Sequence, residues 1–211
     1  MNALCARRIL ASVLFLLLGF PAGSQAADGP VGIDHRLPYD NTGVWQRRNQ
    51  LLLQDGAVLL VFAGALWEGD DTRLGHTFWQ SVDSMALGAV TSEGMKYVFS
   101  RSRPAQTDDP NMWFQGHGNK SFPSGEVMAI TTAITPFVLE YGSEHPAVWA
   151  LEILPLYDAV ARVKVQAHWQ SDVLASFAIG TAIGAYAHSR TSAISVGILP
   201  GGVTVGWKKS F

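Results

Sequence analysis

Cysteine is almost absent from this 211-residue sequence, and the one that occurs, Cys5, lies in an N-terminal apolar segment. We expect that segment to be removed, which leaves a mature chain without any thiol. This absence excludes structural disulfides, a thiolate nucleophile and a cysteine-bound zinc ion. Any reactive centre must therefore be built from other side chains.

Charge is also scarce, since charged residues make up 15% of the sequence and the formal net charge is −2. There is no polybasic run, so nucleic acid is not an expected partner. The cations that stand out are grouped in short motifs, where a local positive field can oppose the overall negative sign.

The N-terminus has the pattern of an export signal. Arg7 and Arg8 precede a nearly unbroken apolar run from Ile9 to Phe20, and the small residues of Ser24-Gln25-Ala26 follow. The run is short for a membrane span of about 20 residues. We therefore predict a signal peptide over residues 1–26 and a periplasmic protein, with an uncleaved anchor as the alternative.

Apolar periodicity predicts a mainly α fold. Phe78, Val82, Met85 and Ala89, for example, recur at helical spacing. We predict a bundle of five to six helices within residues 27–190, interrupted by an active-site loop over 105–123, and a small C-terminal β-hairpin over 191–211. The expected helices cover residues 45–67, 78–103, 124–141, 146–162 and 168–187.

Long uncharged stretches are few in the predicted helical domain. The longest run from Val127 to Leu139 and from Val173 to Ala187. Both are shorter than the roughly 20 apolar residues of a spanning helix, so we interpret them as buried core helices. Peripheral membrane contact and a membrane-embedded core stay open as alternatives.

Three short segments carry the chemistry: KYVFSRSRP from Lys96 to Pro104, FPSGE from Phe122 to Glu126, and RVKVQAHWQSD from Arg162 to Asp172. His168 and Asp172 are four residues apart, and a carboxylate at that spacing can fix the tautomer of an imidazole. A Ser-Gly pair that opens a helix offers backbone amides to an anion. Taken singly, these features are typical of surface pairs and ordinary helix caps.

Together, the order and spacing K-x6-R-P, P-S-G and R-x5-H-x3-D resemble the type 2 phosphatidic acid phosphatase and vanadium haloperoxidase superfamily. The resemblance covers the stretch from Lys96 to Asp172. It implies a helical core in which the three motifs converge on one phosphate pocket. It also implies a phosphorylated small molecule or lipid as substrate, and neither a metal nor another cofactor.

The resemblance further implies a role for each matching residue. His168 would attack phosphorus and form a phosphohistidine, and Asp172 would orient it. The phosphoryl oxygens would be bound by Lys96, Arg103, Ser124, Gly125 and Arg162.

One position departs from the family pattern. The second motif normally reads P-S-G-H, and its histidine protonates the leaving group, whereas this chain has Glu126. Nearby cations lower the pKa of a carboxyl group, which makes it a poorer acid at neutral pH. Glu126 as a donor with an acidic optimum, His117 as a substitute acid, and a good leaving group such as a diphosphate all remain open.

The sequence therefore predicts a metal-independent phosphoric ester hydrolase that acts on phosphate monoesters or diphosphates, with lipid-linked substrates favoured. The alternative is a non-catalytic pseudo-phosphatase that binds phosphate or phospholipid, which the glutamate at position 126 supports. A vanadate-dependent haloperoxidase is the third and least favoured reading of the same cradle.

Overall fold

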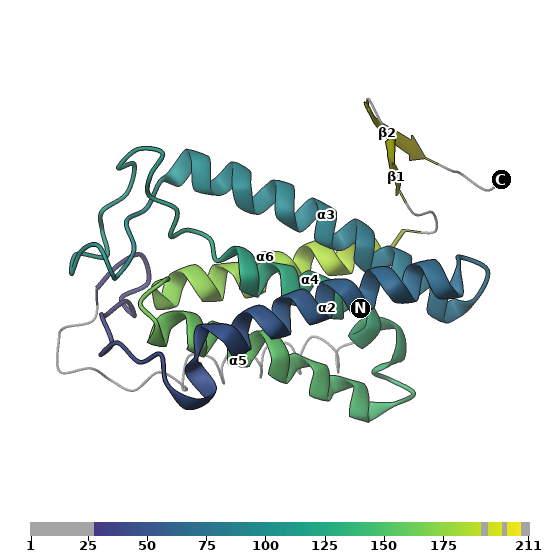
Figure 1. The fold of residues 1–211 in the computed structure, drawn as a ribbon, viewed down its shortest axis with the longest axis horizontal. Coiled ribbons are helices and arrows are strands. Elements are labelled where there is room, and N and C mark those ends of the chain that lie inside the picture. The colour runs from purple at the N-terminus through teal and green to yellow at the C-terminus, as the bar shows by residue number, and fades with distance from the viewer. Residues whose placement is uncertain (1–27, 191–193, 200–201, 208–211) are drawn as a thin grey trace.

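The computed structural model describes residues 28–190, 194–199 and 202–207, and over these residues the chain is mainly α-helical, as predicted (Figure 1). The predicted signal peptide over residues 1–26 lies outside the described residues. The helices are α2 (Arg47–Glu68), α3 (Arg73–Phe99), α4 (Gly125–Tyr141), α5 (Ile153–Lys164) and α6 (Gln170–His188), with short 3₁₀ helices η1 (Gly43–Trp45) and η2 (Pro146–Glu152).

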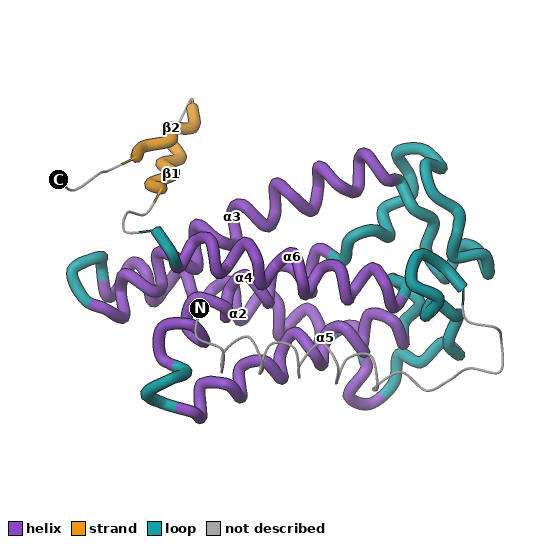
Figure 2. The backbone as a smooth tube through the Cα atoms, turned by 180° about the vertical axis from the view of Figure 1, so that it is seen from behind, coloured by secondary structure: helices purple, strands orange, loops and turns teal. Residues whose placement is uncertain are grey.

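The centre of the bundle is the pair α4 and α6, which lies between α3 on one side and α5 on the other in both views (Figures 1 and 2). Small residues let these two helices approach closely. A Cβ atom on Gly184 would lie 2.5 Å from the Cβ of Thr135, and one on Gly180 would lie 2.9 Å from the Cβ of Thr131. Both threonine hydroxyls donate to carbonyl oxygens one turn earlier in α4, so they are buried without loss of a hydrogen bond.

Helix α2 lies on the outside of the bundle and exposes much of its apolar surface. Leu59, Leu66 and Trp67 are exposed, the last with 89% of its surface accessible. By length and composition alone, α2 is long and apolar enough to cross a membrane, although a soluble core helix or a signal sequence passes the same test. The sequence-based search for spans missed this helix because Asp55 interrupts its uncharged run.

The predicted helix boundaries shift at three places. The helix predicted over 78–103 ends at Phe99, because Ser100 adopts a left-handed conformation with φ 40°. The segment predicted to be helical from Pro146 begins as the 3₁₀ helix η2, and α5 starts at Ile153. The last helix starts at Gln170, so His168 precedes it rather than belonging to it.

The C-terminal strands form the predicted antiparallel pair. Strand β1 (Ile194–Leu199) pairs with β2 (Gly202–Trp207), with Val196 opposite Val205. Both views show the pair standing apart from the helices, at the end of the bundle opposite the 100–124 loop (Figures 1 and 2).

A buried arginine joins three separate segments at the other end of the bundle. The side chain of Arg101, which has no accessible surface, pairs with Asp34 at 2.6 Å and with Asp172 at 2.5 Å. Its guanidinium also donates to the carbonyl of Pro110 and lies 4.3 Å from the centre of the Trp113 ring. The N-terminal lead-in, the loop after α3 and the start of α6 are thereby tied to one cation.

Replacing Arg101 with alanine should lower the free energy of unfolding by about 3–5 kcal/mol, because two buried carboxylates lose their partner. Urea unfolding followed by circular dichroism measures this change. Arg36 is the matched control, since its ion pair with Asp108 is largely exposed. Arg36→Ala should cost about 1 kcal/mol or less, and equal losses in the two variants would contradict the assigned role of Arg101.

Candidate active site

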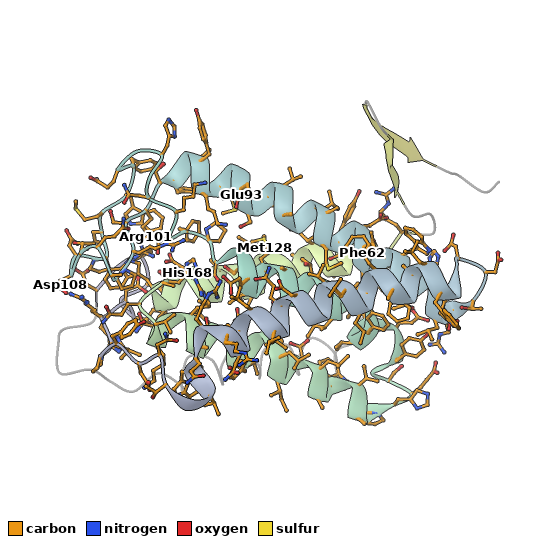
Figure 3. All side chains as sticks on the ribbon, in the orientation of Figure 1. Phe62, Glu93, Arg101, Asp108, Met128 and His168 are labelled. Carbon is orange, nitrogen blue, oxygen red and sulfur yellow. The ribbon has the colours of Figure 1, made fainter. Side chains whose placement is uncertain are left out.

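The three sequence motifs meet at the end of the bundle that carries the 100–124 loop. The first motif ends α3, the second leads into α4 and the third links α5 to α6. In Figure 3, His168 lies among these helix ends, close to the loop that carries Arg101. The convergence expected from the sequence is therefore present in the fold.

His168 is held in one tautomer by the main chain. The imidazole is 3% exposed, and its Nδ1 lies 2.6 Å from the carbonyl oxygen of Ser121. Because a carbonyl oxygen can only accept a hydrogen bond, Nδ1 carries the proton and Nε2 presents a lone pair. Burial lowers the pKa of His168 well below 6.5, and the charges of Arg162, Arg103 and Lys96 lower it further. The ring is thus a neutral potential nucleophile with three cations around it.

The expected hydrogen bond from His168 to Asp172 is not formed, which corrects the helix-face argument. Nδ1 of His168 lies 3.9 Å from the nearer Asp172 oxygen, because His168 precedes α6 and turns toward Ser121. The Asp172 carboxylate accepts instead from the hydroxyl of Ser121 at 2.6 Å and from the Trp169 amide at 2.9 Å. Asp172 and His168 are therefore linked through Ser121 rather than by a direct hydrogen bond. Burial raises the pKa of Asp172 to about 6, and the charge of Arg101 opposes that shift.

Lys96 approaches the first turn of α4 because residue 125 is a glycine. A Cβ atom on Gly125 would lie 2.8 Å from Nζ of Lys96 and 3.3 Å from the Ser92 hydroxyl. The ammonium group also donates to Glu93 at 2.7 Å. The predicted contact between the first and second motifs is thus made by the ammonium of Lys96 at the N-terminus of α4, where an anion is favoured.

Buried donors without partners face this same region of the fold. The hydroxyl of Ser124 and Nε of Arg162 are buried and have no hydrogen-bond partner among the described residues. Ser124 precedes α4 as predicted, yet its hydroxyl does not cap the helix. Buried polar groups in native proteins are nearly always satisfied, so these two donors are available to accept a ligand that offers oxygen acceptors. Burial lowers the pKa of Arg162, while the charges of Glu126 and Asp158 oppose that shift.

A sequence model of the PAP2 superfamily matches residues 77–194, which is more than half of the chain. The chain belongs to the PAP2 superfamily. The resemblance drawn from the three motifs is thereby confirmed. A lipid A 1-phosphatase from Porphyromonas gingivalis is 34% identical over 108 residues, which cover 48% of this chain and 22% of that protein. The match thus spans about a fifth of the relative's length, and no solved structure matches.

Glu126, at the position where the PAP2 resemblance places an acid histidine, is engaged by an arginine that sequence reasoning missed. Arg47 donates to both oxygens of Glu126, at 2.5 and 2.8 Å, and Nη1 of Arg162 lies 3.5 Å from the same carboxylate. The hydrogen bond to Glu126 raises the pKa of Arg47. No motif pointed to Arg47, because it lies 79 residues from Glu126 in the sequence.

Two other predicted site residues, Arg103 and His117, lie in different surroundings. Arg103 is partly buried and close enough to His168 to lower its pKa, which places it with the other cations of the PAP2 motifs. His117, in contrast, is exposed on the 100–124 loop and stacks on the ring of Tyr97 at 4.6 Å. Arg101 and Asp34 were not predicted at all, although Arg101 falls within the first motif.

The protonation of His168 can be followed by nitrogen NMR of the imidazole. We expect it to remain the neutral Nδ1–H form well below pH 6.5, because burial and three nearby cations disfavour the charged ring. Since unfolding restores an ordinary pKa, this group destabilises the folded state progressively as the pH falls through 6.5. Titration at or above the value of free histidine would contradict the geometry.

Gly125→Ala tests the contact between Lys96 and α4. The added Cβ should displace the ammonium and weaken the binding of inorganic phosphate by about tenfold, as expected for loss of one charge-assisted hydrogen bond. Calorimetric titration with phosphate provides the measurement. Gly94→Ala is the control, because a Cβ at that helical glycine meets nothing within 4 Å. Equal affinity in the two variants would refute the contact.

Proposed function

We propose that this protein is a phosphatase that removes phosphate from a lipid-linked substrate, with His168 as the nucleophile. The observation that carries the proposal is the state of His168. Its imidazole is neutral, donates from Nδ1 to the Ser121 carbonyl and lies among three cations. Membership of the PAP2 superfamily supports the same activity.

Substrate binding would use the buried donors that lack partners. Arg162 would bind phosphoryl oxygens through its Nε edge, with Lys96 and Arg103 adding positive charge. The Ser124 hydroxyl and the Gly125 amide would complete the cradle at the N-terminus of α4. These groups would also stabilise the charge that develops on the equatorial oxygens in the transition state, so that side-chain cations supply what a metal ion supplies elsewhere.

The chemical step would be an in-line displacement at phosphorus. The lone pair of His168 Nε2 forms a bond to phosphorus while the bond to the leaving oxygen breaks, and that oxygen keeps the electron pair. The imidazole becomes a cationic phosphohistidine whose Nδ1–H continues to donate to the Ser121 carbonyl. Water then attacks phosphorus and the bond from phosphorus to Nε2 breaks, so that the histidine leaves as the neutral ring. One proton of the water stays on the inorganic phosphate and the other passes through solvent to the leaving oxygen. Asp172 would keep Ser121 in place through both steps.

Two features favour a lipid-linked substrate. Helix α2 exposes a large apolar surface, and a cavity of about 460 Å³ lies between α2, α4 and the η2–α5 segment, lined by apolar residues such as Leu53, Ile134 and Leu154. The volume is within the range of ligand pockets. The relative described as a lipid A 1-phosphatase supports the same substrate class. We place the protein in the periplasm, in contact with a membrane surface.

A pseudo-phosphatase is the second candidate, and one observation favours it. Glu126 is held in a bidentate ion pair with Arg47, and an ionised carboxylate cannot protonate a leaving group. A chain without a working proton donor could bind phosphate and fail to release an alcohol. The haloperoxidase reading has no such support from the described residues.

The deciding experiment measures hydrolysis of an aryl phosphate and of a lipid diphosphate by wild type, His168→Ala, Glu126→Gln and Glu126→His across the acid to alkaline range. We expect His168→Ala to lower turnover by about 10³-fold or more, because the nucleophile is lost. Undiminished turnover in His168→Ala would sink the mechanism. Inactivity of wild type, with activity gained in Glu126→His, would establish the pseudo-phosphatase instead.

A further inference from the structure

Two arginines from different helices are held by the same two acceptors. Arg47, the first residue of α2, donates through Nη1 to Oε1 of Gln50 at 3.2 Å, and Arg162 on α5 donates through its Nη1 to the same oxygen at 3.0 Å. Both also contact the Glu126 carboxylate. The two Nη1 atoms are thus at most about 6 Å apart. Gln50 is fully buried and fixed by a bond to the Trp45 carbonyl, so this spacing is well defined.

The guanidinium of Arg47 still has a free edge. A guanidinium carries five N–H donors, and the described contacts of Arg47 use three of them, two toward Glu126 and one toward Gln50. The remaining two belong to Nε and Nη2, which form one bidentate edge of the group. The side chain as a whole is 38% exposed, so Arg47 is partly accessible to solvent.

Arg162 presents the equivalent edge inside the site. Its Nη1 is occupied by Gln50, whereas its Nε is buried and has no partner among the described residues. Two guanidinium groups, neither of which uses its Nε in a described hydrogen bond, are therefore held by one glutamine and one glutamate, and the buried Asp158 carboxylate interacts electrostatically with both. A pair of adjacent forks suits two linked phosphoryl groups, because each fork matches one phosphate bidentately.

We propose that Arg47 forms a second anion subsite, which binds the phosphate adjacent to the one attacked by His168, so that the substrate is a diphosphate rather than a monoester. This inference rests on the proposed function and names its substrate class more narrowly. Arg47 binds the substrate directly, and Glu126 is a positioning residue that fixes the guanidinium by its other edge.

The reaction balances without a proton donor at position 126. His168 Nε2 bonds to the terminal phosphorus, the bond from that phosphorus to the bridging oxygen breaks, and the electron pair stays on the bridging oxygen. The leaving group is then a phosphate monoester anion, which needs no proton to depart and which the permanently charged Arg47 stabilises. A glutamate that holds an arginine can thus occupy the position of an acid histidine, and the cleavage of a diphosphate would still proceed.

Binding of an inert diphosphate analogue tests the subsite without turnover. We expect wild type to bind methylenebisphosphonate at least about tenfold more tightly than inorganic phosphate, because two forks are engaged instead of one. Arg47→Ala should weaken bisphosphonate binding by about 10- to 100-fold more than it weakens phosphate binding. Arg48→Ala, which removes an exposed neighbouring arginine, should change neither.

Two further variants distinguish the effect of the charge of Arg47 from that of its bidentate hydrogen-bonding edge. Arg47→Ala combined with Glu126→Gln removes the ion pair without changing the net charge, and it should still lose the bisphosphonate preference. Arg47→Lys keeps the charge but not the bidentate edge, and its preference should be intermediate. A wild type that binds both ligands equally, or an Arg47→Ala variant that weakens both equally, would overturn the proposal.

Turnover gives an independent measurement with an alkyl diphosphate and the monophosphate of the same alcohol. Arg47→Ala should reduce kcat/KM for the diphosphate by about 10- to 100-fold more than it reduces kcat/KM for the monophosphate. Equal reductions of kcat/KM for the two substrates in Arg47→Ala would overturn the proposed subsite. Retained activity in His168→Ala would instead refute the proposed function, while the bisphosphonate titration would still decide the subsite.

Discussion

The buried cation of Arg101 is the interaction on which the site depends. A guanidinium without any accessible surface is tolerable only because Asp34 and Asp172 neutralise it and the Pro110 carbonyl takes further donors. These partners come from three segments far apart in the sequence. An irregular lead-in, a long loop and a helix start, none of which would hold its position alone, are thereby fixed against one another.

The position of the reactive histidine follows from that cluster. Asp172 is anchored by Arg101, it orients Ser121 through the hydroxyl, and Ser121 holds Nδ1 of His168 through its carbonyl. Because Nδ1 donates to a carbonyl oxygen and not to a carboxylate, no full negative charge is hydrogen-bonded to the ring. Burial and three cations lower the pKa of His168 by more than the hydrogen bond to Ser121 raises it, so the imidazole is neutral, which is the state that the proposed nucleophile requires.

The sequence could predict what depends on local spacing and could not predict what depends on distant partners. Helix periodicity predicted the bundle, and the family resemblance carried by the three motifs implied that Lys96, Ser124 and His168 converge. The hydrogen bond assumed between His168 and Asp172 was wrong because the helix starts two residues after the histidine. Arg47 and Asp34 escaped notice because their partners lie 79 and 67 residues away, and nothing in the neighbourhood of either residue signals a site.

The exchange of an acid histidine for Glu126 changes what kind of help a leaving group can receive. A histidine can deliver a proton. Glu126 instead holds Arg47, whose guanidinium supplies a fixed positive charge because it does not deprotonate in the working range of an enzyme. Fixed charge favours a leaving group that departs as an anion. The same helix that begins with Arg47 continues as the exposed apolar surface of α2 and lines the apolar cavity. In the proposed function, one element thus joins a site for charge to an apolar surface, which is the combination that a phosphorylated lipid would match.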